Sequence, residues 1–540
     1  MSGPLAARPA RYVRPMSEQI TNIAGIVRVH GVDRAESIAL IQDDRTQTWA
    51  ELLERSSRVA QGLAASGVGA ADRVAFLDKN GIEHFEVFFG AAMLNAVCVD
   101  VNWRLAAPEV QFIVDDADAK VLVVGPDFVP ILDQIAGSLP KVEQFVVIGG
   151  HPEHESYDDW VARHEPVDPG GEGAADDIAF QLYSSGTTGR PKGVMLSNDN
   201  FFGLLPLAKE IWELDGDAVN LVAMPLFHIG GGGWAIAGMY EGCTSVIFRE
   251  LDPAALITTL VERKVTHAFL VPAVLQFMLM VPGVAEADYS NLKVFVYGAS
   301  PISEEVLAAC VEMFQPCKFW QAYGLTETTG AVVNLPPDDH DPTGPNRHRL
   351  RSCGVAGPGV ELRIVGDEGE TLGPDEVGEI WIRSRQNMVG YWHLPEETAK
   401  ALTDDGWFKS GDAGYLDADG YLYIHDRVKD MIVSGGENVY PAEVENVLMK
   451  HPAIADVAVI GVPHEKWGET AKAIVVIADG HSADDDTAAE IIAFAKTQLA
   501  TFKCPTSVDY TDMLPRNPSG KILKKDLREP YWEGHSRRVS

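Results

Sequence analysis

The chain has 540 residues, 46% of them hydrophobic, so it can bury a large core and we expect more than one domain. Its 78 acidic residues outnumber its 44 basic ones, which gives a formal net charge of −34. That charge repels nucleic acids and anionic lipids over most of the surface, so no nucleic-acid partner is expected.

Six cysteines occur without a CxxC pair or a metal-ligand spacing. This pattern favours reduced thiols and a cytoplasmic location, and it does not indicate a zinc site. The first residues carry Arg8, Arg11 and Arg14 but no apolar segment, so no secretory signal is expected, and a disordered tail is favoured over a transit peptide.

Apolar runs at 73–77, 96–99 and 120–124 predict strands, and 83–94 predicts a helix. Alternation of buried strands with helices is typical of an α/β fold. A polar, glycine-rich linker at 168–177 then leads to another expected strand at 178–183.

A loop rich in hydroxyl groups and glycine follows that strand and reads YSSGTTGRPKGV. Gly186 and Gly189 allow backbone conformations that present successive N–H groups to an anion. The loop also offers hydroxyl donors and one lysine, at Ser184, Ser185, Thr187, Thr188 and Lys192. This combination predicts a triphosphate site. The Walker A motif is a poor match, because Pro191 precedes the lysine and Gly193 follows it, and a flexible surface linker remains the alternative.

The segment PLFHIGGGGW follows a strand-like run at 221–224 and contains His228, Gly232 and Trp234. Its four consecutive glycines, at 230–233, remove side-chain bulk beside the histidine. A core or capping histidine and a plain flexible turn are the alternative interpretations.

Residues 268–285 form an 18-residue stretch without charge, the lower length limit for a membrane helix. Pro272 and Pro282 argue against that reading. We expect a strand that ends near Val271, then a buried helix, and no transmembrane segment. A membrane-facing apolar patch is the minor alternative.

Five more motifs follow in the second half of the chain. An expected strand at 291–297 leads into a turn at Gly298-Ala299-Ser300. The remaining motifs are QAYGLTET at 321–328, KSGD at 409–412, DRVKD at 426–430 running into SGGEN at 434–438, and PSGK at 518–521. Around them, predicted helices at 441–450 and 487–499 and strands at 457–462 and 471–477 indicate a compact α+β unit.

In this order, the phosphate loop and the later motifs resemble the adenylate-forming superfamily of acyl-CoA synthetases, aryl-CoA ligases, luciferases and peptide-synthetase adenylation domains. The resemblance spans nearly the whole chain. It implies a large N-terminal AMP-binding domain at 1–426, with α/β subdomains and a β-rich subdomain. It also implies a small, mobile α+β C-terminal domain at 427–540 that rotates about Lys429.

The resemblance assigns nucleotide contacts to residues along the whole chain. The phosphate contacts are Ser184, Ser185, Gly186, Thr188, Gly189 and Lys192. The adenine contacts are Gly298, Ala299, Ser300, Tyr323 and Gly324, with Thr326 on the α-phosphate and Asp412 and Arg427 on the ribose. Taken singly, Asp412 could be a turn aspartate and Arg427 a surface salt-bridge partner.

The resemblance also assigns the chemistry. Lys521, Thr187 and Glu327 are implied as catalytic residues, and Glu327 also as the magnesium ligand. A solvent-exposed lysine and a charge at a helix start are the simpler explanations for Lys521 and Glu327. Gly435 and Gly436 would line a tunnel for the pantetheine thiol.

His228, Gly232 and Trp234 would border the acid, with the histidine as a gate and the tryptophan as a wall.

The implied function is an ATP-dependent acyl-CoA synthetase that uses magnesium and coenzyme A and activates a hydrophobic carboxylic acid. A fatty acid is the leading substrate class, and an aryl- or polycyclic-acid CoA ligase and an acyl-AMP ligase are the alternatives. A non-catalytic nucleotide-binding protein is disfavoured because Lys521, Glu327 and the loop hydroxyls are all present. A hydrolase is disfavoured because no Gly-x-Ser-x-Gly elbow occurs. The oligomeric state stays open, with a homodimer as one alternative.

Overall fold

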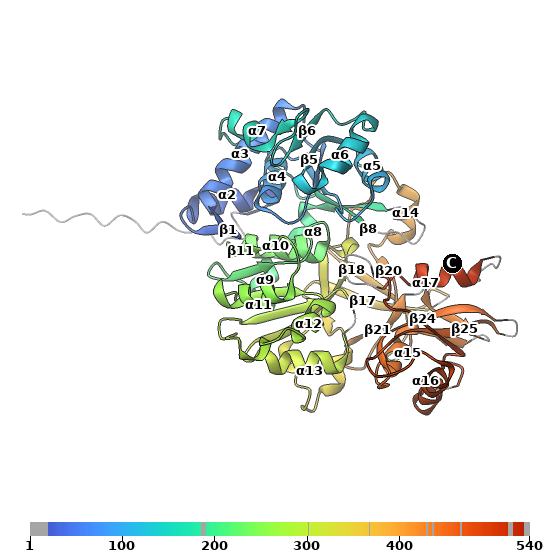
Figure 1. Cartoon of the computed structure of the whole chain (residues 1–540). Coiled ribbons are helices and arrows are strands. Elements are labelled where there is room, and N and C mark those ends of the chain that lie inside the picture. Colours follow the sequence, from blue (N-terminus) through green and yellow to red (C-terminus); the bar gives the residue numbers. More distant parts are fainter. Residues whose placement is uncertain are drawn as a thin grey trace, which may run out of the picture.

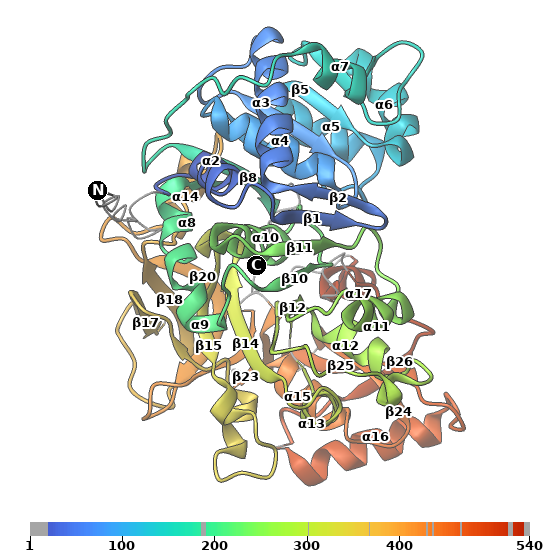
Figure 2. The same cartoon turned by 90° about the vertical axis from the view of Figure 1, so that its left-hand side faces the viewer.

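The computed structural model describes residues 20–184, 191–300, 302–366, 368–427, 430–434, 437–464, 467–499, 501–516 and 522–533. At 425–427, 433, 437–438 and 468 it describes the backbone only. Figures 1 and 2 show a large part built on two α/β sheets and a β-rich unit, with a smaller C-terminal part drawn in orange to red.

The first sheet carries the strand that leads into the phosphate loop. Within the described residues its strand order is β19 (Gly390–Tyr391), β9 (Lys192–Ser197), β8 (Ile178–Ser184), β4 (Val97–Asp100), β3 (Arg73–Leu77), β5 (Ala119–Val124), β6 (Gln144–Val147), β7 (Glu155–Ser156). Its central strands are parallel, and β9 runs antiparallel to β8. The strands predicted at 73–77, 96–99, 120–124 and 178–183 are confirmed to within one residue at each end.

Helices cover both faces of this sheet, because successive side chains of a strand point to opposite sides. Ala75 and Leu77 pack with α5 (Ala107–Asp116) and α6 (Val129–Ile135). Val74 and Phe76 pack on the other face with α3 (Trp49–Ala65), α4 (Ile82–Met93) and α7 (Tyr157–Arg163). The apolar side chains of β3 therefore pack alternately into two separate hydrophobic cores.

The second sheet has the order β16 (Val355–Ala356), β15 (Gly330–Leu335), β14 (Lys318–Leu325), β13 (Val294–Gly298), β12 (His267–Leu270), β10 (Val219–Val222), β11 (Thr244–Ile247), β1 (Ile38–Gln42), β2 (Arg45–Thr48). Its described helices include α10 (Ile229–Glu241), α11 (Pro253–Glu262), α12 (Pro272–Leu279) and α13 (Glu304–Met313). Strands β10 to β14 are parallel, so their carboxyl ends share one edge. Ligands bind at such edges in open α/β sheets.

The uncharged stretch at 268–285 contains β12 and α12, as predicted. Pro272 is the first residue of α12, a position where its missing N–H has no intrahelical partner to lose. Within the described residues, no helix combines the length and the apolar character needed to cross a bilayer.

The β-rich unit is an antiparallel sheet of β17 (Val360–Val365), β18 (Gly378–Ser384), β20 (Phe408–Leu416) and β21 (Leu422–Arg427). The short helix α14 (Pro395–Ala401) lies between β19 and β20 in the chain. In Figure 1 this unit lies between the α/β sheets and the C-terminal part.

The C-terminal part has its own sheet of β22 (Ile432–Ser434), β23 (Glu437–Val439), β24 (Ile454–His464), β25 (Gly468–Ile477) and β26 (Ser507–Tyr510). Helices α15 (Pro441–Leu448) and α16 (Asp485–Gln498) pack on it through a separate apolar cluster, and α17 (Lys524–Trp532) contacts β24. The chain is therefore a mixed α/β fold with a large N-terminal and a smaller C-terminal domain.

Candidate active site

The two ends of the predicted phosphate loop lie side by side. β8 ends at Ser184 and β9 begins at Lys192, and these two residues are register partners in the antiparallel ladder. The loop thus begins at the end of a strand, as the sequence predicts. The predictions for Ser185, Gly186, Thr187, Thr188 and Gly189 fall outside the described residues.

Glu327 faces this loop although it lies 143 positions from Ser184. It sits in the short helix η5 (Thr326–Thr328), directly after β14. The Ser184 hydroxyl donates to Glu327 Oε1 at 3.2 Å, and the Tyr391 hydroxyl donates to the same oxygen at 3.1 Å. These bonds aim the carboxylate at the start of the loop, with Thr326 immediately beside it. A carboxylate oxygen next to a phosphate loop is the ligand type that magnesium prefers, so the residues present fit that ion.

Lys192 is held by a second carboxylate. Its Nζ lies 2.5 Å from Glu397 Oε2 on α14, and 4.9 Å from the centroid of the Tyr391 ring. Lys400 donates to the other oxygen of Glu397 at 2.7 Å. Hydrogen bonds from Lys192 and Lys400 lower the pKa of Glu397 to about 2.

The predicted adenine residue Tyr323 and the predicted ribose residue Asp412 contact each other. The Tyr323 hydroxyl on β14 donates to Asp412 Oδ2 on β20 at 2.8 Å. Asp412 is buried, and its own N–H donates to Ser410 Oγ. Gly411 has a φ of +70° and donates its N–H to Glu379 Oε1. Asp412 pairs with Arg427 in the β20–β21 ladder, where the structure describes only the backbone of the arginine.

Two glycines allow the strands beneath this site to approach one another. A Cβ at Gly298 would lie 2.1 Å from the carbonyl oxygen of Ala322, and one at Gly324 would lie 1.8 Å from that of Gly330. Side chains at these positions would force β13, β14 and β15 apart. Ala299 follows with a φ of +65°, and Ser300 is half-buried. The sequence-predicted turn 298–300 therefore caps β13 at the carboxyl edge.

The carboxyl half of β14 is partly accessible although the strand lies inside the sheet. Its residues from Trp320 to Leu325 are each only half-buried, whereas β13 beside it is buried throughout. This part of the strand lies at the carboxyl edge, where open α/β sheets bind ligands. Glu327 follows directly after β14, and Asp412 contacts Tyr323 on it.

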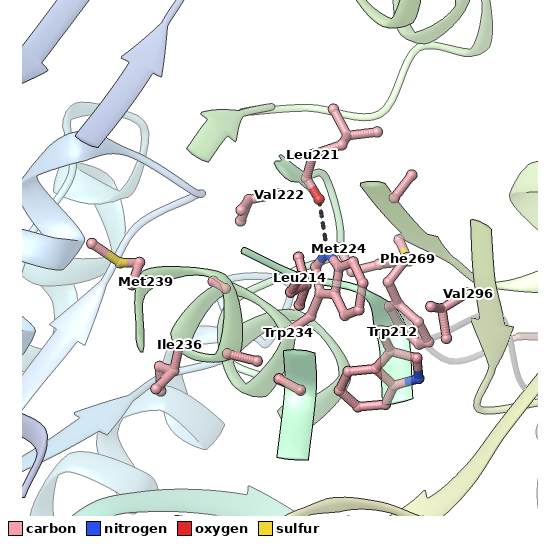
Figure 3. Packing of buried hydrophobic residues seen from close by; sticks show 14 of the residues in the cluster. Trp212, Leu214, Leu221, Val222, Met224, Trp234, Ile236, Met239, Phe269 and Val296 are labelled. Carbon is pink, nitrogen blue, oxygen red and sulfur yellow. Dashed lines mark hydrogen bonds between the residues drawn. The ribbon is translucent and has the colours of Figure 1, made fainter. Parts of the chain in front are cut away.

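The glycines at 230–233 lie in the first turn of α10, so the alternative of a flexible turn is wrong. The structure gives a packing reason, because a Cβ at Gly232 would lie 2.8 Å from the Leu226 carbonyl oxygen. Trp234 points away from the start of this helix into the core. Figure 3 shows it against Trp212 and Phe269, with its Nε1 donating to the Leu221 carbonyl at 3.1 Å.

His228 occupies the N-cap position of α10 but makes no side-chain capping bond. Its Nε2 is buried and has no hydrogen-bond partner among the described residues. Burial, with repulsion from Arg104, lowers the pKa of His228 to about 4. The imidazole is therefore neutral at physiological pH and can accept or donate a hydrogen bond without carrying charge.

Some predicted residues are not placed by the structure. Lys429, Gly435, Gly436 and Lys521 lie outside the described residues. Their predicted roles remain predictions.

Sequence reasoning missed Tyr391 and Glu397. Tyr391 bonds Glu327 and lies over Lys192, so it connects two predicted functional residues. Glu397 is 205 positions from Lys192. A Gly-Tyr-Trp triplet before a proline-initiated helix was the available signal, but nothing in it points to a lysine so far away in the chain.

The site thus joins the two ends of the predicted phosphate loop, a carboxylate beside them, a tyrosine–aspartate pair and the carboxyl ends of parallel strands. The AMP-binding enzyme family model matches residues 28–392, and the AMP-binding enzyme C-terminal domain model matches residues 443–521.

Similar proteins include a fatty acid–[acyl-carrier-protein] ligase of Streptomyces coeruleorubidus, 40% identical over 97% of this chain and 99% of that protein. Another is the long-chain-fatty-acid–CoA ligase FadD13 of Mycobacterium tuberculosis, 38% identical over 90% of this chain and 94% of that protein.

Among solved structures, an anthranilate CoA ligase in complex with anthranoyl-AMP is similar with a TM-score of 0.87, at 28% identity over 96% of this chain and 99% of that one. ATP-bound MatB from Rhodopseudomonas palustris is similar with a TM-score of 0.86, at 29% identity over 95% and 100% of the two chains.

The family models cover most of the chain, and relatives more than 30% identical match it nearly end to end. The chain belongs to the AMP-binding enzyme family, within the adenylate-forming superfamily of acid–thiol ligases that its motifs predict.

Proposed function

We propose that this ligase activates a hydrophobic carboxylic acid with ATP and magnesium, and then transfers the acyl group to the thiol of coenzyme A. A fatty acid is the leading substrate class, and an aryl or polycyclic acid is the alternative. The observation that carries the proposal is that Tyr323 on β14 pairs with Asp412, and that Glu327 directly after β14 pairs with Ser184 at the start of the predicted phosphate loop.

The first half-reaction makes an acyl adenylate. A carboxylate oxygen of the acid attacks the α-phosphorus of ATP, and the bond from that phosphorus to the pyrophosphate oxygen breaks. Charge accumulates on the phosphorus, so positioning and electrostatic stabilisation dominate the catalysis. Magnesium, held by Glu327, would neutralise phosphate charge there.

The protein's own groups supply the positioning. Tyr323 presents a ring face for the adenine, and Asp412 presents a carboxylate for ribose hydroxyls. Lys192 brings a cation to the end of the phosphate loop. We propose that Lys521 bridges the substrate carboxylate and a phosphate oxygen, and that Thr187 contacts the phosphates.

The second half-reaction needs a thiol to reach the acyl carbonyl. We propose that residues 427–540 rotate about Lys429 for this step and that Gly435 and Gly436 line the thiol path. The boundary is supported by the strands, because β21 up to Arg427 pairs with β20 whereas β22 from Ile432 pairs with β25.

The whole chain is more similar to ATP-bound MatB, with a TM-score of 0.86, than to apo MatB, with 0.76. This difference supports an adenylate-forming arrangement of the two domains.

The test measures acid-dependent pyrophosphate release across fatty, aryl and polycyclic acids, followed by CoA-dependent release of AMP and thioester. We expect Lys521→Ala to lose acyl-AMP formation, while thioester formation from supplied acyl-AMP largely survives. Equal loss in both half-reactions would reject the role given to Lys521. No pyrophosphate release with any acid would reject the function.

A carrier-protein thiol is the second candidate acceptor. The similarity over 97% of this chain to a relative named a fatty acid–[acyl-carrier-protein] ligase favours it. Parallel reactions with CoA and with a phosphopantetheinylated carrier protein separate the two, because only the true acceptor yields a thioester at low concentration.

A further inference from the structure

Lys192, the only lysine of the phosphate loop, already has an anionic partner inside the protein. We propose that Glu397 competes with the pyrophosphate part of ATP for the Lys192 ammonium group and thereby keeps pyrophosphate weakly bound. This inference rests on the proposed function and assigns Glu397 as a positioning residue for it.

The backbone fixes the pair in place. Lys192 begins β9, which pairs with β19, and the Trp392 N–H donates to the Gly193 carbonyl at 2.7 Å. The Tyr391 N–H then donates to Thr398 Oγ1 on α14, the residue after Glu397. The side chains of Lys192 and Glu397 are only 14% and 26% exposed. The backbone pairing and the low exposure of both side chains therefore distinguish this ion pair from a mobile ion pair at the surface.

Glu397 carries its charge throughout the physiological pH range. Lys192 and Lys400 each donate to one of its oxygens, and together they lower its pKa to about 2. An incoming phosphate group thus always meets a negative charge beside Lys192. It either displaces Glu397 from the ammonium group or binds next to it and is repelled.

Tyr391 places this competition at the pyrophosphate end of the site. Its ring lies 4.9 Å from Lys192 Nζ, and its hydroxyl donates to Glu327, the carboxylate at the start of the loop. The residues proposed to hold adenosine, Tyr323 and Asp412, contact each other, whereas Glu397 contacts Lys192 and Lys400. Glu397 should therefore weaken the binding of pyrophosphate but leave the binding of AMP unchanged.

This selectivity suits the order of the reaction. Pyrophosphate must leave after the acyl adenylate forms, because its return regenerates ATP and the free acid. A carboxylate that reclaims Lys192 as pyrophosphate departs favours the forward direction.

The experiment compares wild type with Glu397→Gln, which keeps a hydrogen-bond acceptor for Lys192 but removes the charge. Glu396→Gln is the matched control, because Glu396 precedes Glu397 in α14 and is exposed. Calorimetric titrations with magnesium pyrophosphate and, separately, with AMP give both affinities without any acid substrate. Product inhibition of acyl-AMP formation by pyrophosphate gives an independent measure.

We expect Glu397→Gln to bind pyrophosphate about five- to tenfold more tightly and AMP within twofold of wild type. Glu396→Gln should match wild type for both ligands. The tighter pyrophosphate binding of Glu397→Gln should vanish in the double variant that also carries Lys192→Gln. Unchanged or weaker pyrophosphate binding by Glu397→Gln, in an enzyme that still forms acyl-AMP, would overturn the inference and leave the proposed function standing. A parallel gain in AMP affinity would overturn it too.

Discussion

Glu241 is a buried acid at an unfavourable place, the last residue of α10. It is 5% exposed, and the partial negative charge of a helix C-terminus disfavours its ionised form. Burial, reinforced by repulsion from Asp215 and only partly offset by Lys209, raises the pKa of Glu241 to about 7. We predict that Glu241→Gln stabilises the protein in a pH-dependent way.

The sign and size of the change in unfolding free energy follow from the linkage between protonation and folding. Between the ordinary value of 4.5 and the folded value of about 7, the folded state binds more protons than the unfolded state, so stability falls as pH rises. A pKa difference of about 2.5 corresponds to about 3 kcal/mol when both states are ionised. Glu241→Gln should therefore gain about 2 kcal/mol at pH 6 and about 3 kcal/mol at pH 8, and almost nothing below pH 4.5.

Urea unfolding of the N-terminal domain, followed at pH 5, 6, 7 and 8, measures this difference. Glu262→Gln is the control, because Glu262 is also the last residue of a helix, α11, but is exposed. Its stability difference should stay small, because an exposed side chain on a helix contributes little to folding. A Glu241→Gln gain that is constant over the whole pH range would refute the reasoning, since removal of a buried charge cannot act equally where that charge is absent.

Three further predictions concern the packing and the site. Trp234→Ala removes a buried ring that packs on Trp212 and Phe269, so it should lower the free energy of unfolding in urea by about 3–5 kcal/mol. Trp467→Ala is the control and should cost far less, because that side chain is 41% exposed. Asp412→Asn should weaken ATP binding at least about tenfold, because the Tyr323 hydroxyl keeps an acceptor while the ribose loses a charged one. If calorimetry gave the variant the same ATP affinity as wild type, the ribose role of Asp412 would be rejected. His228→Asn should change the KM for the acid but not the shape of the pH–rate profile between pH 6 and 9, because burial lowers the pKa of His228 to about 4. If the variant lost an ionisation between pH 6 and 9, the histidine would be shown to titrate in that range.

The elements of the fold were predictable where apolar runs were long and bounded by turn residues. β3, β5 and β8 agree with the predicted ranges to within one residue, because strands buried on both faces read as nearly continuous apolar runs. The start of α10 was not predictable, because four glycines in a row disfavour a helix intrinsically. Close packing against the Pro225 and Leu226 carbonyls favours that helix, and this is tertiary information.

Part of the site was also predictable. Tyr323, Asp412, Ser184 and Glu327 sit in short motifs, and the structure joins them in two hydrogen-bonded pairs that the motifs alone did not predict. Tyr391 and Glu397 escaped prediction because their importance comes from partners that are distant in the sequence. Pairing of β19 with β9 brings them to Lys192, and sequence patterning does not specify which short edge strand joins which sheet.

The bond between Tyr323 and Asp412 has a practical meaning for how this enzyme can be divided. The AMP-binding family segment ends at residue 392, before α14, β20 and β21, yet Asp412 comes from β20. A fragment cut at that point would lose Asp412, the partner of Tyr323, and Glu397, the partner of Lys192. Deletion, fusion or domain-exchange experiments should therefore place their junction after the β20–β21 hairpin, near the start of the C-terminal sheet, so that both contacts are kept.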